Sequence, residues 1–459
     1  MTEDVLPGSF RDPAGFVFER EGVLYRQVNE RHRDDYDRFM SSGLYEALVS
    51  EGLLVTHEPV EEPGLTSEAS LVLRPSRVPF ISHPYEWCFS ELKDAALATL
   101  RIQEIAMDHG MSLRDASAYN VQFVDGRPLL IDTLSFEGLE EGKPWVAYKQ
   151  FCQHFLAPLA LMSYRDVRLG QLLQTNIDGI PLDLAVSLLP RAARFRLGLQ
   201  LHLFSHAKSQ RKHQGAAVGR SGSGRAFSVQ AFRGLVSSLA GAVRKLDWDP
   251  GRTTWSEYYS EAEHYSADAL DSKKTLVTKL IEEVSPANVW DLGGNVGVFA
   301  RVPADRGINT VCFDLDEASV EANYRKVRAN GETNLLPLVL DLTTPTPSVG
   351  WANSERPSLV QRGPADLALA LALVHHLAIG NNVPLPMVAD FLADVCRAAI
   401  VEWVPKEDPK VQTLLASRED VFPGYTAEGF EQAVGRRFEI ERSEPIAGSP
   451  RTLYLLRRR

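Results

Sequence analysis

Residues suited to chemistry gather in the C-terminal half of the chain, where apolar runs end. In the stretch 288–301, an apolar run ends at Asp291. A glycine-rich bend follows and leads into a second apolar segment. Glycine lets the backbone approach a ligand closely, and the first turn of a following helix offers unpaired N–H groups. Taken alone, this stretch fits a dinucleotide fingerprint, a nucleoside-binding turn or a plain structural turn.

Four later apolar runs have the same form, because each ends in or leads to side chains that bind ligands or move protons. They are 310–313 with Asp314, 335–340 with Asp341, 366–371 with His375 and His376, and 399–403 with Glu402. Open α/β sheets bind ligands at the carboxyl ends of their strands, so these side chains are expected to share one site. A carboxylate such as Asp314 can accept both ribose hydroxyls, and a histidine with a pKa near neutrality suits proton removal.

The elements that must position these residues are predicted from the alternation of strands and helices after residue 253. Such alternation predicts an α/β fold with a parallel sheet and right-handed crossovers. A helix is expected to be capped near Asp271 or Ser272 and to stop at Pro286. Near the C-terminus, 438–442 and 452–456 alternate as strands and predict an antiparallel hairpin that closes the sheet.

This C-terminal part resembles the class I S-adenosylmethionine-dependent methyltransferases. Asp291, Gly293 and Gly297 match the first motif of that family, Asp-x-Gly-x-x-x-Gly. Asn295 stands where the commoner form of the motif has its middle glycine, and asparagine tolerates a left-handed backbone better than most residues. The resemblance implies a seven-stranded Rossmann-like sheet with an antiparallel terminal hairpin, and S-adenosyl-L-methionine as the cofactor.

The resemblance also implies the roles of individual residues. The implied cofactor-binding set is Asp291, Gly293, Gly294, Asn295, Gly297, Asp314, Leu315, Asp341 and Leu342. The candidates for base or positioning group are His375, His376 and Glu402. An NAD-dependent enzyme is the alternative, and it is disfavoured because the spacing of the glycines does not fit Gly-x-Gly-x-x-Gly. An aromatic group upstream, Trp255, Tyr258, Tyr259, His264 and Tyr265, is expected to form a lid or to pack an N-terminal helix.

A second constellation lies in the N-terminal part, where Asp115, Asn120 and Asp132 surround a hairpin with the turn Asp125-Gly126. This layout resembles the catalytic loop and metal-binding aspartate of the protein-kinase and aminoglycoside-phosphotransferase superfamily. The resemblance implies that Asp115 takes a hydroxyl proton and that Asn120 and Asp132 hold magnesium if this part is active.

The rest of the superfamily pattern is missing. The predicted hairpin 15–28 has no glycine-rich phosphate loop, and the nearest stand-in for the superfamily's strand lysine is Arg26, with Glu46 as its conceivable partner. We therefore expect a degenerate α+β kinase-like module without kinase activity, and no metal site.

Four regions follow from these patterns. They are a kinase-like or recognition module at 1–140, a helical extension at 141–205, a basic linker with an amphipathic helix at 206–250, and the methyltransferase domain at 251–459. No acidic residue lies between Asp183 and Asp247. This basic block (191–245) predicts an anionic partner, either nucleic acid or lipid. Its amphipathic part, 227–246, predicts a helix that packs on a domain or binds a membrane surface or another anionic partner.

Composition limits the class of protein. The net charge is −11, which does not favour general attraction to nucleic acid. The chain contains four widely spaced cysteines and no long apolar run, so neither a zinc site nor a transmembrane segment is expected. These features predict a cytoplasmic protein, and they leave its oligomeric state open.

The sequence therefore predicts an S-adenosylmethionine-dependent methyltransferase whose acceptor is positioned with help from the N-terminal module. The whole chain also resembles bacterial methyltransferase-domain proteins related to a rhizobial nodulation protein, which implies a small-molecule or glycan acceptor. Two alternatives are a bifunctional protein with an active phosphotransferase half and a regulatory protein that binds the cofactor without turnover.

Overall fold

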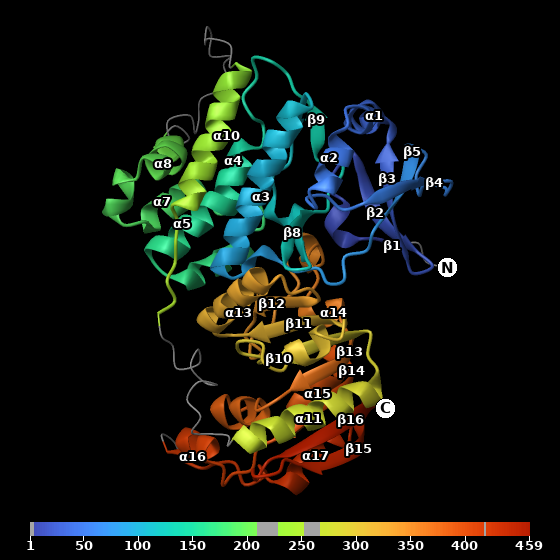
Figure 1. Ribbon diagram of the computed structural model, residues 1–459, viewed down its shortest axis with the longest axis vertical. Coiled ribbons are helices and arrows are strands. Elements are labelled where there is room, and N and C mark those ends of the chain that lie inside the picture. The colour runs from blue at the N-terminus through green and yellow to red at the C-terminus, as the bar shows by residue number, and fades with distance from the viewer. Residues whose placement is uncertain (1–3, 209–227, 252–266, 417–418) are drawn as a thin grey trace. The chain divides into compact units, whose positions relative to one another are not determined.

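The computed structural model describes residues 4–208, 228–251, 267–416 and 419–459 (Figure 1). The chain divides into two compact units. Unit 1 comprises Met1–Asp249 and Val349–Arg356, and unit 2 comprises Pro250–Ser348 and Pro357–Arg459. Residues 209–227 of the predicted basic linker and the aromatic group at 255–265 lie outside the described residues.

Unit 2 is built on a seven-stranded sheet with the order β12-β11-β10-β13-β14-β16-β15. Its strands are β10 (Asn288–Leu292), β11 (Asn309–Asp314), β12 (Leu335–Val339), β13 (Ala365–Ala370), β14 (Cys396–Trp403), β15 (Phe438–Pro445) and β16 (Thr452–Arg458). The first five are mutually parallel, whereas β16 pairs antiparallel with β14 and with β15. The predicted seven strands and antiparallel terminal hairpin are both present.

Helices of unit 2 connect these strands. They are α11 (Ala267–Val284), α12 (Arg301–Ala304), α13 (Glu317–Asn330), α14 (Leu359–Arg362), α15 (Leu385–Val395), α16 (Pro409–Leu415) and α17 (Ala427–Val434). The apolar face of α11 is buried against the sheet through Val277, Leu280 and Ile281. The prediction of a cap near Asp271 or Ser272 is wrong, because α11 is already helical at residue 267 and both residues lie inside it.

Unit 1 begins with a five-stranded antiparallel sheet of order β1-β2-β3-β5-β4. Its strands are β1 (Asp4–Val5), β2 (Gly15–Arg20), β3 (Val23–Asn29), β4 (His57–Val60) and β5 (Ala69–Pro75). The predicted hairpin is confirmed, with its turn at Glu21 and Gly22 at φ of 53° and 78°. Two helices follow, α1 (Arg33–Ser41) and α2 (Leu44–Ser50), and Gly43 between them is left-handed at φ 77°.

The remainder of unit 1 is mainly helical. A long helix, α3 (Phe89–Asp108), precedes β6 (Met111–Leu113), the predicted hairpin of β7 (Val121–Val124) and β8 (Arg127–Leu130), and β9 (Phe136–Gly138). Short helices α4 (Tyr148–Phe151), α5 (Ala157–Tyr164), α6 (Leu172–Thr175), α7 (Leu182–Leu188) and α8 (Leu197–Leu199) follow. The amphipathic segment forms α10 (Val229–Arg244), which runs beside α3 and buries Phe232, Val236 and Leu239 (Figure 1). This helix therefore packs within unit 1.

The segment 349–356, which the sequence places in the C-terminal domain, groups with unit 1. Glu355 is 1% exposed and accepts two hydrogen bonds from the Arg11 guanidinium, at 2.7 and 2.8 Å. Arg356 lies over the ring of Tyr119, 4.2 Å from its centroid. These contacts fix the segment to unit 1. Within the described ranges, no helix is long and apolar enough to cross a membrane.

Candidate functional site

The glycine-rich bend after β10 has a left-handed backbone at three alternate residues. Gly293, Asn295 and Gly297 have φ values of 77°, 52° and 76°. Only glycine adopts this conformation without strain, and asparagine is among the few other residues that tolerate it. The substitution of asparagine for glycine thus preserves the bend. Arg301 secures it by donating to the carbonyls of Val296 and Gly297 at 2.8 and 3.0 Å.

Space around the bend is also restricted. A Cβ atom on Gly294 would lie 2.6 Å from Oδ2 of Asp291 and 2.4 Å from the Cys312 sulfur. A Cβ atom on Gly297 would lie 2.5 Å from Nδ2 of Asn323. Both positions therefore exclude larger side chains for steric reasons that are independent of any ligand.

Asp314 ends β11 and lies against this bend. Its Oδ2 accepts the backbone N–H of Asn295 at 2.7 Å, and its Oδ1 accepts the backbone N–H of Asp316 at 2.9 Å. Burial raises the pKa of Asp314 to about 6, although these hydrogen bonds favour the ionised form. Asp316 caps α13 by accepting the N–H of Ser319 at 3.3 Å.

Asp291 is the most deeply buried carboxylate of the bend. It is 1% exposed, and among the described residues its Oδ2 has no hydrogen-bond partner. Burial raises the pKa of Asp291 to about 7, the nearby charge of Lys273 lowers it, and the charge of Asp314 raises it. A buried carboxylate oxygen without a donor is costly in a folded protein, and it is a natural acceptor for a cationic or hydroxylic ligand.

A buried charge network adjoins Asp291. Lys273 on α11 donates to Oε2 of Glu402 at 2.6 Å, and Arg451 donates to Oε1 of the same carboxylate at 3.2 Å. Arg451 also pairs with Asp408 at 2.7 Å. Lys273 lies 4.4 Å from the centroid of the Phe299 ring, and burial lowers the pKa of its ammonium. Glu402 is fully buried and pairs with both cations, so it ties Lys273 and Arg451 to the carboxyl end of β14.

The two histidines follow β13, and their rings lie tilted at 38° to each other with centroids 4.1 Å apart. Burial lowers the pKa of His375 to about 2 and that of His376 to about 4. Both imidazoles are therefore neutral at pH 7. His375 is 2% exposed, whereas His376 is only partly buried, so His376 has better access to a ligand.

The remaining predicted residues lie at the ends of β11 and β12. Leu315 follows Asp314 and is 62% exposed, an unusual position for a large apolar side chain beside a buried carboxylate. Asp341 is exposed and accepts both the N–H and the hydroxyl of Thr343, at 2.8 and 2.7 Å. Leu342 is partly buried.

A series of charged and titratable groups, in which the charge of each member acts on its neighbour, links the ends of these strands. Its members are Asp314, Asp291, Lys273, Glu402, Arg451 and His375. Asp341 does not belong to this series. Sequence reasoning missed Lys273 and Arg451. Lys273 precedes Val277 by four residues on the buried face of α11, and a lysine at such a position was a usable signal. Nothing local distinguishes Arg451.

The N-terminal constellation also comes together. Asp132 accepts a hydrogen bond from Ser135 at 2.6 Å, and Ser135 accepts one from Asn120 at 3.3 Å. Burial raises the pKa of Asp115, and the nearby charge of Asp132 raises it further. The guanidinium of Arg26 pairs with Asp132 at 2.5 Å.

The expectation that Glu46 partners Arg26 is wrong. Glu46 is exposed on α2, and Arg26 pairs with Asp132 and, at 3.5 Å, with Asp12. Asp12 also accepts a hydrogen bond from Arg114 at 3.1 Å. The carboxylate of Asp132 is thus neutralised from within the chain. Among the described residues, no group of three or more histidine, cysteine, aspartate or glutamate side chains could hold a metal ion.

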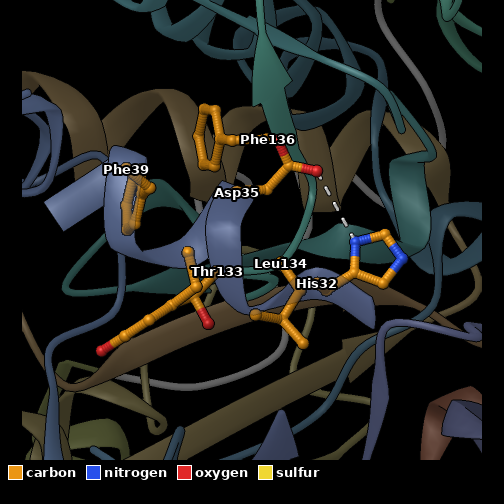
Figure 2. Close-up of a pocket in the computed structure, with 7 residues that line it drawn as sticks. His32, Asp35, Phe39, Thr133, Leu134 and Phe136 are labelled. Carbon is orange, nitrogen blue, oxygen red and sulfur yellow. Dashed lines mark ion pairs between the residues drawn. The ribbon is translucent and has the colours of Figure 1, made fainter. Parts of the chain in front are cut away.

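A small pocket lies beside this constellation (Figure 2). It is lined by His32, Asp35, Tyr36, Phe39, Thr133, Leu134 and Phe136. His32 and Asp35 form an ion pair of 3.8 Å when the imidazole is charged, but burial lowers the pKa of His32. The pocket therefore lies between α1 and the loop that follows Asp132.

The chain is similar over almost its whole length to a curated protein. It is 36% identical over 461 residues to the nodulation protein NoeA of Rhizobium meliloti (strain 1021), an alignment that covers 99% of this chain and 96% of that protein. No family model matches the chain.

Solved structures show weaker similarity. WbdD is 19% identical with a TM-score of 0.32, covering 44% of this chain and 43% of WbdD, so the alignment spans less than half of that protein. One WbdD structure is described as a bifunctional kinase-methyltransferase. Magnesium protoporphyrin IX methyltransferase from Synechocystis PCC 6803, with bound SAH, is 18% identical with a TM-score of 0.30, covering 42% of this chain and 86% of that one.

Proposed function

The chain belongs to the family of the nodulation protein NoeA, and we propose that it is an S-adenosylmethionine-dependent methyltransferase. The observation that carries this proposal is the bend after β10, where left-handed residues at 293, 295 and 297 bring a backbone N–H to the carboxylate of Asp314. We infer that the nucleoside of the cofactor binds beside this carboxylate. The unpartnered Oδ2 of Asp291 fits the amino-acid tail of the same cofactor.

Each cofactor contact follows from a described feature. Asp314 binds the ribose hydroxyls, and the exposed Leu315 offers an apolar surface to the adenine, with Asp341 and Leu342 at its edge. Gly293, Gly294, Asn295 and Gly297 let the backbone approach the ligand, and Asp291 receives its cationic end.

The chemistry supplied by the bound cofactor is a sulfonium-bound methyl group that is already electrophilic. His376 accepts the proton that the acceptor loses, because it is neutral at pH 7 and partly accessible. A weak base is sufficient there, since the nucleophile becomes more acidic as it gains the methyl group. His375 and Glu402 are buried and act as positioning residues.

A small-molecule or glycan acceptor is proposed over a polyanion. The net charge of −11 opposes the approach of nucleic acids, whose binding depends on basic residues. All four cysteines are free and buried, which suits action in the cytoplasm.

Calorimetry with S-adenosylmethionine tests the cofactor assignment. Asp314→Asn should weaken binding at least tenfold. The matched control is Asp366→Asn, because Asp366 lies at the opposite end of the same sheet and accepts the N–H of Ala287 at 3.0 Å. Absence of binding by the wild type at millimolar cofactor would refute the proposal.

An acceptor screen with labelled methyl donor then tests turnover. Methylation of a small molecule or glycan, with His376→Ala lowering kcat about a hundredfold at unchanged cofactor affinity, supports the mechanism. Cofactor binding without methylation of any acceptor would favour a regulatory protein that senses the cofactor.

Unit 1 is proposed to orient the acceptor, as a kinase-like scaffold without phosphotransfer. Support comes from Arg26, whose guanidinium occupies the carboxylate of Asp132 that a magnesium ion would need. Titration of the full chain with magnesium and ATP tests this, and no binding at millimolar nucleotide is expected. Magnesium-dependent binding that Asp132→Asn abolishes would instead indicate an active phosphotransferase half.

A further inference from the structure

Three large apolar side chains protrude from one short stretch of unit 1. Phe195 is 90% exposed and Leu197 is 83% exposed, and Leu201, one turn further on, is 51% exposed. Phe195 ends the short 3₁₀ helix Arg191–Phe195, Leu197 begins α8, and Leu201 lies in the π-helical turn Gln200–Phe204. The same stretch is anchored from beneath, because Ala193, Leu199 and Leu203 are buried. The protruding side chains therefore sit on a fixed base.

Arginines flank these side chains. Arg191, Arg194 and Arg196 are all exposed. The guanidinium of Arg194 lies 5.3 Å from the centroid of the Phe204 ring, whereas Arg191 and Arg196 have no ion-pair partner in the part of the chain that the structure describes. This stretch lies in the block without acidic residues, in a protein whose net charge is −11. This stretch is thus locally positive, although the protein as a whole is negative.

The shape of this surface identifies the partner. Side chains that are 83% and 90% exposed project outward, so a protein partner would need a matching cavity for each of them. A fluid lipid surface needs no such cavity, because acyl chains and headgroups rearrange around inserted side chains. Anionic headgroups attract the flanking arginines, and the two contributions add.

We propose that residues 191–201, the apolar-basic surface of unit 1, dock on an anionic lipid bilayer, with Phe195, Leu197 and Leu201 inserted between headgroups. The surface lies in unit 1 and its chemistry does not depend on methyl transfer. It places the protein at a membrane surface.

Vesicle sedimentation with the full chain tests this proposal. We expect binding to vesicles of phosphatidylcholine with phosphatidylglycerol, little binding to phosphatidylcholine alone, and loss of binding as salt increases. The double variant Phe195→Ser/Leu197→Ser and the double variant Arg191→Gln/Arg196→Gln should each reduce binding at least fivefold. All four side chains are exposed, so the fold should be unaffected, as circular dichroism and cofactor affinity can verify.

The matched control is Val146→Ser, since Val146 is 63% exposed elsewhere in unit 1 and its replacement should leave binding unchanged. Equal vesicle binding by the wild type and both double variants would overturn the proposal. So would absence of binding to anionic vesicles, or conversion of a wild-type dimer to a monomer by Phe195→Ser/Leu197→Ser, which would assign the surface to a second copy of the chain.

Discussion

The backbone N–H of Asn295 donates to Oδ2 of Asp314 at 2.7 Å, and this bond joins the bend after β10 to the end of β11. Asn295 makes this bond in a left-handed conformation, at φ 52°. One residue therefore controls both the shape of the proposed nucleoside site and the orientation of its principal carboxylate.

Replacement of Asn295 should show this control directly. Asn295→Gly should keep cofactor affinity within about threefold, because glycine adopts a left-handed backbone freely. Asn295→Val should weaken binding about tenfold, since a left-handed conformation costs an L-residue about 1–2 kcal/mol. Calorimetry on both variants checks this, and equal affinities would show that the backbone conformation is not what matters.

Cofactor affinity should rise with pH through neutrality. The pKa values of Asp291 and Asp314 are raised to about 7 and about 6, so both carboxylates gain protons as the pH falls below these values. Only the ionised forms attract a cationic tail and accept ribose hydroxyls. Affinity should therefore fall about tenfold per pH unit between about 7 and about 6, where only Asp291 gains a proton, and about a hundredfold per unit below about 6, where both carboxylates do. Calorimetry between pH 5.5 and 8.5 measures this effect, and constant affinity would contradict it.

Lys273→Met should shift that pH dependence upward. The ammonium of Lys273 lowers the pKa of Asp291, so its removal leaves the carboxylate protonated to higher pH. The midpoint of the affinity profile should therefore move to higher pH, while Lys279→Met, at an exposed position on the same helix, should leave it in place. The same titration distinguishes the two variants.

Arg26→Ala should destabilise unit 1 by about 3 kcal/mol, because it leaves the largely buried Asp132 carboxylate without its cation. The double variant Arg26→Ala/Asp132→Ala should recover part of this loss. Hydrogen exchange of β2 and β3 amides reports the free energy of opening. Arg20→Ala is the control, since its pair with Glu62 is more exposed and should cost less than about 1 kcal/mol.

Glu355→Ala should release the segment 349–356 from unit 1. The Glu355 carboxylate accepts both Arg11 and the N–H of Trp351, the latter at 3.0 Å, so its loss removes three hydrogen bonds. Faster hydrogen exchange at Trp351 is expected, with no change in β10 or β13. Unchanged protection of Trp351 would show that Arg356 and Tyr119 hold the segment without Glu355.

The sheet of unit 2 could be predicted closely because its strands are apolar runs with clear ends. β10, β11 and β13 lie within one residue of their predicted bounds. The sequence did not predict β4, because Pro59 disfavours a strand. The structure places β4 at the edge of its sheet, where proline is tolerated. Contacts such as Arg451 with Glu402 join residues distant in sequence and leave no local pattern.

Because the segment 349–356 belongs to unit 1, unit 1 is completed by residues that are synthesised late. Arg11 emerges from the ribosome long before Glu355, its partner, so unit 1 cannot acquire its final contacts until synthesis has passed residue 356. Part of unit 2 is by then already outside the ribosome. The two units therefore mature together rather than one after the other, and a cut at residue 250 would leave both fragments incomplete.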